Sequence, residues 1–239
     1  AEEIYNILYT DKSFKIDTLW KRQSMIDLFG EQYNPYITNI LVLLGYEIHC
    51  KNMKIKNYEN EKKELYKQRV KEVLTNDIFA RKLHGIRISQ MIWAAYFINA
   101  KLIEVGRLQY ERCENHIKIH IPSGENLEIE KVLQSIKDSK QEIEKYFNKR
   151  NPEYRCDSWL LSNQINAIID KNSNIAKFYN LFEVKDGLDA TKDILNFVFN
   201  VQKCSNYNDL VENTSLQKLL KQQLLKNKEI KIGCGKLKI

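Results

Sequence analysis

The feature that most constrains the fold of this chain is a change in the spacing of its apolar residues at Leu102. Upstream of Leu102, apolar side chains recur at the spacing typical of helices. Over Leu102–Cys113 and again over His116–Pro122 they alternate with polar side chains, as in strands that bury one face. Glu114 and Asn115, between these stretches, suit a tight turn. The sequence therefore predicts an antiparallel strand pair.

The register of this pair follows from residue parity. Glu111 is expected opposite Lys118, and Gln109 opposite His120. One face of the pair is then polar and also carries Arg107. The other face is apolar and must cover helices, and it consists of Leu108, Tyr110, Ile117, Ile119 and Ile121.

Helices are predicted over most of the chain before Leu102. Their expected ranges are 13–30, 35–48, 57–71 and 89–101, and the charged third segment is either a solvated helix or a linker. We therefore predict a mainly helical N-terminal section over residues 1–87.

Helices and strands are interleaved after the strand pair. A helix is predicted over 127–147, with a buried stripe of Ile129, Val132, Leu133, Ile136, Ile143 and Phe147. Strands are expected over 154–161 and 181–184, with a terminal strand or hairpin over 229–239 that bends at Gly233 and Gly235. Shorter helices should follow caps at Ser162 or Asn163, at Thr191 and at Thr214. This pattern predicts an α+β (mixed α/β) domain over residues 88–239.

Positive charge is concentrated at one end of the chain. Lysine and arginine number 38 against 31 aspartates and glutamates, a net charge of +7. The last 22 residues contain seven lysines and one glutamate, and so hold +6 of this total. Lysine-rich segments are most often solvated, and no zinc-finger, RNA-recognition or basic-zipper pattern is present. We therefore expect no nucleic-acid partner. Nucleic-acid binding through these lysines is kept as an alternative hypothesis.

The five cysteines are widely spaced and form no C-x-x-C pair. We therefore expect no disulfide framework or structural zinc site, and a reducing cytoplasm as the location. The longest strongly apolar run, Ile37–Ile48, is too short and too polar to span a bilayer, so no membrane span is expected. The oligomeric state is left open.

No phosphate loop, nucleophile elbow, dinucleotide fingerprint or zinc-protease helix is present. The polar face of the strand pair does carry residues capable of acid–base chemistry. Glu111, with Gln109 and His120 beside it, is the first candidate for a general base. The alternative is a solvated face on which Glu111 and Lys118 form an exposed ion pair. His116 and His120 share this face, but no third metal ligand lies nearby, so no metal is expected.

The predicted strand over 154–161 carries a second set of candidates. Asp157 and Ser158 are adjacent and point to opposite faces, so they cannot both serve one triad with His120. Asp157, beside Trp159 on one face, is the second candidate for a base. Ser158 is expected to face a core or a cleft.

Asn174 is one further candidate. Asn174 after Ser173 either caps a helix or contacts substrate.

Five short motifs occur in a fixed order along the chain. They are Gly106-Arg107-Leu108-Gln109-Tyr110-Glu111, His120-Ile121-Pro122, Cys156-Asp157-Ser158-Trp159-Leu160-Leu161, Ser173-Asn174-Ile175 and Thr214-Ser215-Leu216-Gln217. Together they resemble a bacterial acyltransferase-like family with a GNAT-like C-terminal domain, over about residues 88–239. A vaguer likeness over residues 39–53 is to the family's N-terminal acyltransferase domain.

The resemblance implies a mixed sheet flanked by helices and transfer of an acyl group from acyl-CoA, or an acyl carrier, to an amine or another small acceptor. Arg107, Ser158, Trp159 and Asn174 are then candidate binding residues, and Lys231 and Lys236 could meet the phosphates of coenzyme A. The usual Gly-containing pyrophosphate loop is missing, which keeps a non-catalytic GNAT-like module that binds a ligand or a protein as the rival. A splayed gap between two parallel strands beneath the polar face could hold a pantetheine arm, whereas a closed sheet could not.

Overall fold

The computed structural model describes residues 59–79, 90, 93–94, 96–97, 100–201 and 203–238. The chain divides into two compact units, residues 1–103 and 104–239. The helices predicted over 13–30 and 35–48 lie outside the described residues, and the boundary predicted between residues 87 and 88 stays a prediction.

The first unit contains helix α5 (Asn60–Phe79), so the charged segment predicted over 57–71 is a helix. Tyr66 and Val70 of this helix are buried. Residues 90, 93, 94, 96 and 97 are also helical, within the range predicted over 89–101. The rings of Tyr66 and Phe97 lie 5.4 Å apart, so the charged helix contributes apolar side chains to a core.

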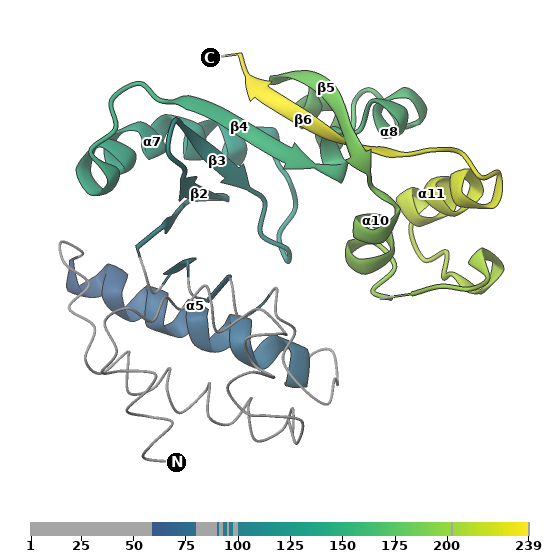
Figure 1. The fold of residues 1–239 in the computed structure, drawn as a ribbon, viewed down its shortest axis with the longest axis horizontal. Helices are drawn as coiled ribbons and strands as arrows, with labels where there is room; N and C mark the ends of the chain where they lie inside the picture. Colours follow the sequence, from purple (N-terminus) through teal and green to yellow (C-terminus); the bar gives the residue numbers. More distant parts are fainter. Residues whose placement is uncertain are drawn as a thin grey trace, which may run out of the picture. The chain divides into compact units, whose positions relative to one another are not determined.

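The described part of the chain contains a six-stranded mixed sheet (Figure 1), with strand order β1-β2-β3-β4-β6-β5. The strands are β1 (Leu102–Val105), β2 (Leu108–Arg112), β3 (His116–His120), β4 (Glu153–Ser158), β5 (Phe182–Asp189) and β6 (Lys231–Leu237). Strands β3 and β4 are parallel, whereas the pairs β2/β3, β4/β6 and β5/β6 are antiparallel.

The predicted register of the first antiparallel pair is confirmed. Gln109 lies opposite His120, and Glu111 lies opposite Lys118. The apolar face is as predicted for Leu108, Tyr110, Ile117 and Ile119, which are buried. Ile121 follows the end of β3 and is only partly buried.

The prediction of one strand over Leu102–Cys113 is wrong. The chain turns at Gly106 and Arg107 and forms β1 and β2 instead. Gly106 has a φ of 55°, a left-handed backbone conformation that glycine adopts without steric cost. Arg107 therefore lies in a turn.

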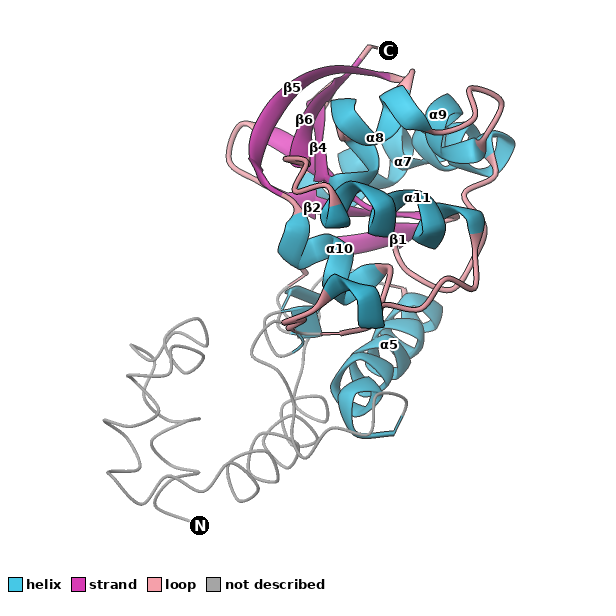
Figure 2. Cartoon of the chain, turned by 90° about the vertical axis from the view of Figure 1, so that its right-hand side faces the viewer, coloured by secondary structure: helices cyan, strands magenta, loops and turns pink. Residues whose placement is uncertain are grey.

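The described residues of the second unit form five α-helices beside the sheet: α7 (Ile129–Phe147), α8 (Asn163–Ile168), α9 (Asn174–Tyr179), α10 (Thr191–Phe197) and α11 (Ser215–Leu225). Figure 2 shows α7, α8 and α9 on one side of β4, β5 and β6. Ser162 caps α8 as predicted, and Thr214 caps α11 in a capping box with Gln217. Thr191 is the first residue of α10 and not its cap, and its backbone N–H donates to the Asp189 carboxylate.

Helix α7 covers the apolar face of the sheet through two buried serines as well as aliphatic side chains. The Ser135 hydroxyl lies 2.9 Å from the Tyr110 hydroxyl of β2, and the Ser139 hydroxyl lies 3.3 Å from the Tyr154 hydroxyl of β4. The prediction that Leu133 lies in the buried stripe is wrong, because its exposed fraction is 42%. The predicted stripe also lacks both serines, because hydrophobic periodicity passes over hydroxyl groups that find partners in a core.

A second core lies between the later helices. It contains Ile165, Ala176, Ile194, Leu220, Leu224 and Ile230, with Trp159 packed against it. The strand predicted over 154–161 ends at Ser158, and Trp159–Leu161 forms the short 3₁₀ helix η1. This turn carries Trp159 into the second core, so its predicted place on one strand face beside Asp157 is wrong.

The predicted bends at Gly233 and Gly235 are also wrong, because both glycines lie inside the continuous strand β6. A Cβ atom at Gly233 would come within 1.9 Å of the Leu161 carbonyl oxygen. One at Gly235 would lie 2.7 Å from the Leu161 Cδ1 atom. Because these two glycines have no side chain, η1 can pack closely against β6.

We expect Gly233→Ala to destabilise the protein by about 3 kcal/mol, because the added methyl group collides with a backbone carbonyl that cannot rotate away. Gly235→Ala should cost less, because its nearest neighbour is the mobile end of a leucine side chain. Urea unfolding of both variants measures the difference. Equal stability of Gly233→Ala and the parent protein would contradict the close approach.

Candidate active site

The pairing of the two parallel strands ends before the strands do. His116, Ile117 and Lys118 of β3 pair with Glu153, Tyr154 and Arg155 of β4. Strand β3 then continues to His120 and β4 to Ser158, and β4 remains paired with β6 as far as Ser158. We call the stretch beyond Lys118 and Arg155 the open seam. It lies at the carboxyl ends of parallel strands, where α/β sheets usually bind ligands.

Glu111 and His120 form a hydrogen-bonded pair beside the open seam. Glu111 Oε2 lies 2.8 Å from His120 Nε2, and the side chains are 9% and 21% exposed. Strand β2 positions Glu111, and His120 is the last residue of β3. The alternative of a solvated face is wrong for β2, because Gln109 and Glu111 are both buried. Buried polar groups of this kind require partners.

Gln109 makes a contact different from the expected one. Its Nε2 atom donates to Glu104 Oε2 at 2.8 Å. Gln109 still lies opposite His120 in the strand register. Its predicted orienting role stays a prediction.

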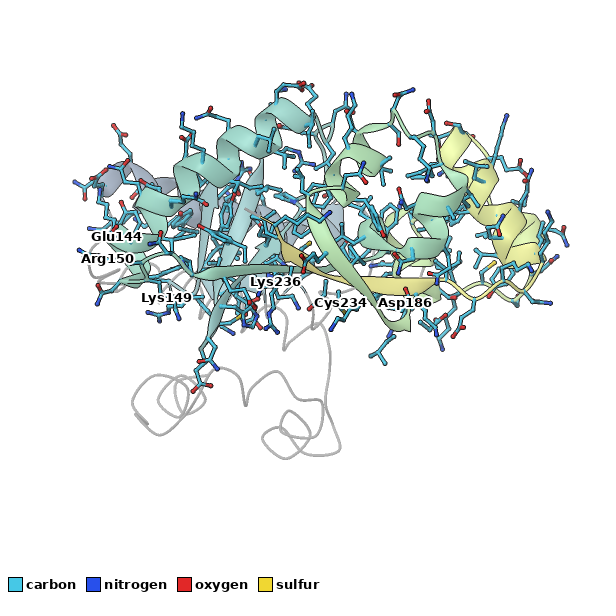
Figure 3. All side chains as sticks on the ribbon, turned by 90° about the horizontal axis from the view of Figure 1, so that it is seen from above. Glu144, Lys149, Arg150, Asp186, Cys234 and Lys236 are labelled. Atoms are coloured by element: carbon cyan, nitrogen blue, oxygen red, sulfur yellow. The ribbon has the colours of Figure 1, made fainter. Side chains whose placement is uncertain are left out.

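Lys118 and Asp157 connect the two strands across the open seam. Lys118 Nζ lies 2.7 Å from Asp157 Oδ2, so Lys118 does not form the exposed pair with Glu111 that was the alternative. Burial opposes the charge of Lys118, but Asp157, with a smaller contribution from Glu111, raises its pKa. Asp157 also lies opposite Cys234 of β6, one of the residues labelled in Figure 3.

Arg107 holds the loop between β3 and α7. Its Nε atom donates to the Asn126 carbonyl at 3.1 Å, and its Nη2 atom donates to the Glu125 carbonyl at 2.8 Å. Burial lowers the pKa of Arg107, and the Glu125 carboxylate partly offsets this. The loop leads to the first turn of α7, where Glu128 makes no side-chain cap. Arg107 is thus fixed to the backbone of the loop that follows β3.

Three predicted binding residues have local structural contacts. Ser158 Oγ accepts a hydrogen bond from the Leu160 backbone N–H at 3.2 Å. Trp159 packs against the second core. Ser173 caps α9, and Asn174 is its first residue, so the expectation that Asn174 is the cap is wrong. A part for Ser158, Trp159 and Asn174 in ligand binding stays a prediction.

The C-terminal lysines have separate partners. Lys231 Nζ lies 3.4 Å from Glu229, and Lys236 Nζ lies 2.5 Å from Glu153. The two lysines are five residues apart on an extended strand, roughly 16 Å along β6. Figure 3 shows Lys236 on β6 in the same stretch as Cys234. The structure therefore does not bring Lys231 and Lys236 together as one phosphate site.

Other chemistry finds little support among the described residues. No group of three His, Cys, Asp or Glu side chains there could hold a metal ion. Burial raises the pKa of the Cys156 thiol to about 12, which makes it a poor nucleophile. Within the same part of the chain, no helix is long and apolar enough to cross a membrane.

The sequence analysis missed two residues next to Asp157. Lys118 shares the parity of His116 and His120, which placed it on the polar face but did not show that it reaches β4. Cys234 comes from a strand more than 70 residues later, and no local pattern connects it with Asp157.

Residues 44–237 match the model of the family described as the GNAT-like C-terminal domain. The match covers most of the chain, which therefore belongs to this family. No curated protein sequence matches it significantly.

Solved acyltransferase structures share the fold. One, in complex with decanoyl-CoA, is 18% identical with a TM-score of 0.67, and the match covers 85% of this chain and 65% of that one. A tryptophan-to-alanine mutant acyltransferase in complex with octanoyl-CoA is 17% identical with a TM-score of 0.72, covering 99% and 84%. A third, in complex with CoA and 10C-teicoplanin, is 16% identical with a TM-score of 0.65, covering 98% and 75%. The predicted GNAT-like fold is thereby confirmed. This chain spans less than two thirds of the length of the first of these structures.

We expect Arg107→Lys to loosen the loop before α7, because an ammonium cannot reproduce the planar fork that reaches two consecutive carbonyls. Amide hydrogen exchange over residues 125–130 should accelerate, and stability should fall by about 2 kcal/mol. Arg155→Lys is the control, because Arg155 is largely exposed and contacts Glu153. Equal exchange in both variants would contradict the role of Arg107.

Proposed function

We propose that this chain is an acyltransferase that moves an acyl group from acyl-CoA to an amine or another small acceptor. The observation that carries the proposal is the open seam between β3 and β4, with the Glu111 and His120 pair at its edge. A seam of this kind offers unpaired strand edges to an extended ligand, next to a group able to accept a proton.

The open seam fits the pantetheine arm of coenzyme A. A strand edge without a neighbour presents N–H and C=O groups that can pair with the amides of the arm. Ile119 and His120 on β3, and residues 156–158 on β4, lie beyond the last ladder pair. The thioester carbonyl would then sit where backbone N–H groups can stabilise its developing negative charge.

The first turn of α7 is the candidate site for the pyrophosphate. It follows the carboxyl end of β3, and its N–H groups have no side-chain cap from Glu128. Gly124 in the preceding loop has a φ of 108°, and a Cβ there would meet nothing within 4 Å. This segment differs in sequence from the usual glycine-containing pyrophosphate loop, and Glu125, Glu128 and Glu130 reduce its attraction for phosphate.

The Glu111 and His120 pair accounts for proton removal from the acceptor. When His120 donates its Nε2 hydrogen to Glu111, its lone pair is on Nδ1, which then accepts the proton. Glu111 fixes this tautomer and stabilises the imidazolium that forms. Asp157 is already paired with Lys118, so we assign the base to the Glu111 and His120 pair and not to Asp157.

The structural neighbours support acyl transfer as the reaction class. They are acyltransferases in complex with CoA or acyl-CoA, and two are also in complex with teicoplanin or 10C-teicoplanin. For this chain we propose a small-molecule acceptor with an attacking amine or hydroxyl, and a cytoplasmic location without a nucleic-acid partner. Lys231 and Lys236 each contact a different glutamate, which supports their interpretation as ordinary surface lysines.

Calorimetry with acetyl-CoA, octanoyl-CoA and decanoyl-CoA tests the proposed substrate. We expect micromolar binding of at least one acyl-CoA, because the open seam and the α7 terminus are both present. Complete absence of binding at every chain length would refute the proposal. Binding without transfer to any of a panel of amines and alcohols would favour the non-catalytic module, and strong salt-dependent retention on DNA would favour a nucleic-acid binder.

We expect Glu111→Gln and His120→Ala to lower the rate of thiol release from acyl-CoA by roughly 10²-fold or more. His116→Ala is the matched control, because His116 shares the strand face but lies at the closed end of the ladder. Thermal unfolding checks that each variant is folded. Equal rates for His120→Ala and His116→Ala would remove the pair from the mechanism.

A further inference from the structure

Lys118 is a cation placed across the open seam. It belongs to the last ladder pair, opposite Arg155, yet its Nζ atom reaches Asp157, two residues further along β4. The ammonium group therefore lies beyond the last ladder pair, at the open seam. Asp157 fixes this position through a contact of 2.7 Å.

The other residue of this ladder pair is oriented differently. Arg155 Nε donates to Glu153 at 2.5 Å, toward the closed end of the pairing. Of these two neighbouring cations, Lys118 is the one that a group inside the open seam would meet.

We propose that the Lys118 ammonium stabilises the thiolate that leaves when the thioester is cleaved. This inference rests on the proposed function and adds the group that receives the leaving charge. The acceptor nitrogen forms a bond with the carbonyl carbon, and the carbon–sulfur bond breaks with its electron pair on sulfur. His120 takes the proton of the acceptor, and Lys118 pairs with the sulfur or protonates it.

Neighbouring carboxylates keep the Lys118 side chain in its charged ammonium form. Asp157 from β4 and Glu111 from β2 favour the ammonium form, and their effect on the pKa of Lys118 exceeds that of burial. Other titratable groups that interact with it among the described residues include Cys113 after β2, His116 on β3, Cys156 on β4 and Cys234 on β6. Asp157 acts as a positioning residue, because it holds the ammonium over the seam.

The direct test is the titration of the thiol of bound coenzyme A, followed by the ultraviolet absorbance of the thiolate. Spectra of the complex with desulfo-CoA are subtracted to remove the absorbance of the protein's own thiols. We expect the bound thiol to titrate roughly 1–3 pH units below its ordinary value, and this shift to be lost in Lys118→Met. Arg155→Met should keep the shift, and Lys118→Arg should restore most of it.

Kinetics provide a second readout. Lys118→Met should lower kcat/KM for an alkyl thioester such as decanoyl-CoA by roughly 10²-fold. It should have little effect on a decanoyl aryl thioester, whose thiolate leaves without help. A general structural defect would lower both rates equally. If Lys118→Met does not fold, the rates for the alkyl and the aryl thioester are measured for Lys118→Arg and Asp157→Asn instead.

The outcomes separate this inference from the proposed function. Failure of coenzyme A to bind the parent protein would refute the proposed function itself. Binding with the same thiol titration in the parent, Lys118→Met and Arg155→Met would overturn the role of Lys118 and leave the open seam as the binding site.

Discussion

The parallel pairing of β3 with β4 is the constraint on which the rest of the second unit depends. Parallel neighbours require a crossover, and α7 provides it and packs on the apolar face of the sheet. The ladder between β3 and β4 has three residue pairs, whereas β4 stays paired with β6 up to Ser158 on its other edge. The open seam therefore lies on the β3 side of β4, while the β6 side of the same residues remains hydrogen-bonded.

The arrangement depends on exact packing at β6. Gly233 and Gly235 let η1 approach the strand, and η1 turns the chain from β4 into the second core. A side chain at Gly233 would push η1 away from the sheet and disturb the end of β4. The same glycines therefore affect both the core and the open seam.

Buried polar groups beside the seam have specific partners, as the cost of burying them demands. Arg107 holds the loop before α7, Gln109 contacts Glu104, and Glu111 contacts His120. On the opposite face, Ser135 and Ser139 connect α7 to tyrosines of β2 and β4. Hydrogen bonds thus orient the sheet, the helix and the candidate catalytic pair relative to one another.

Local patterns in the sequence predicted the helix over 127–147, the register of Glu111 and Gln109, and the caps of α8 and α11, because each depends on neighbouring residues. They placed Glu111 and His120 on one face of one strand pair, which the structure confirms. They failed at Gly106, where a glycine conformation ends a strand, and at Trp159, where a distant core captures the chain.

What the sequence by itself determined is the alternation and the turn that set β2 against β3, together with the family to which the chain belongs. Only the tertiary structure decided that β3 pairs with β4 for three residues, that Lys118 reaches Asp157 and that Cys234 lies beside them. The physical reason is sequence separation. Periodicity reports which face a side chain occupies, whereas contacts between strands that are tens of residues apart depend on how the whole sheet is assembled.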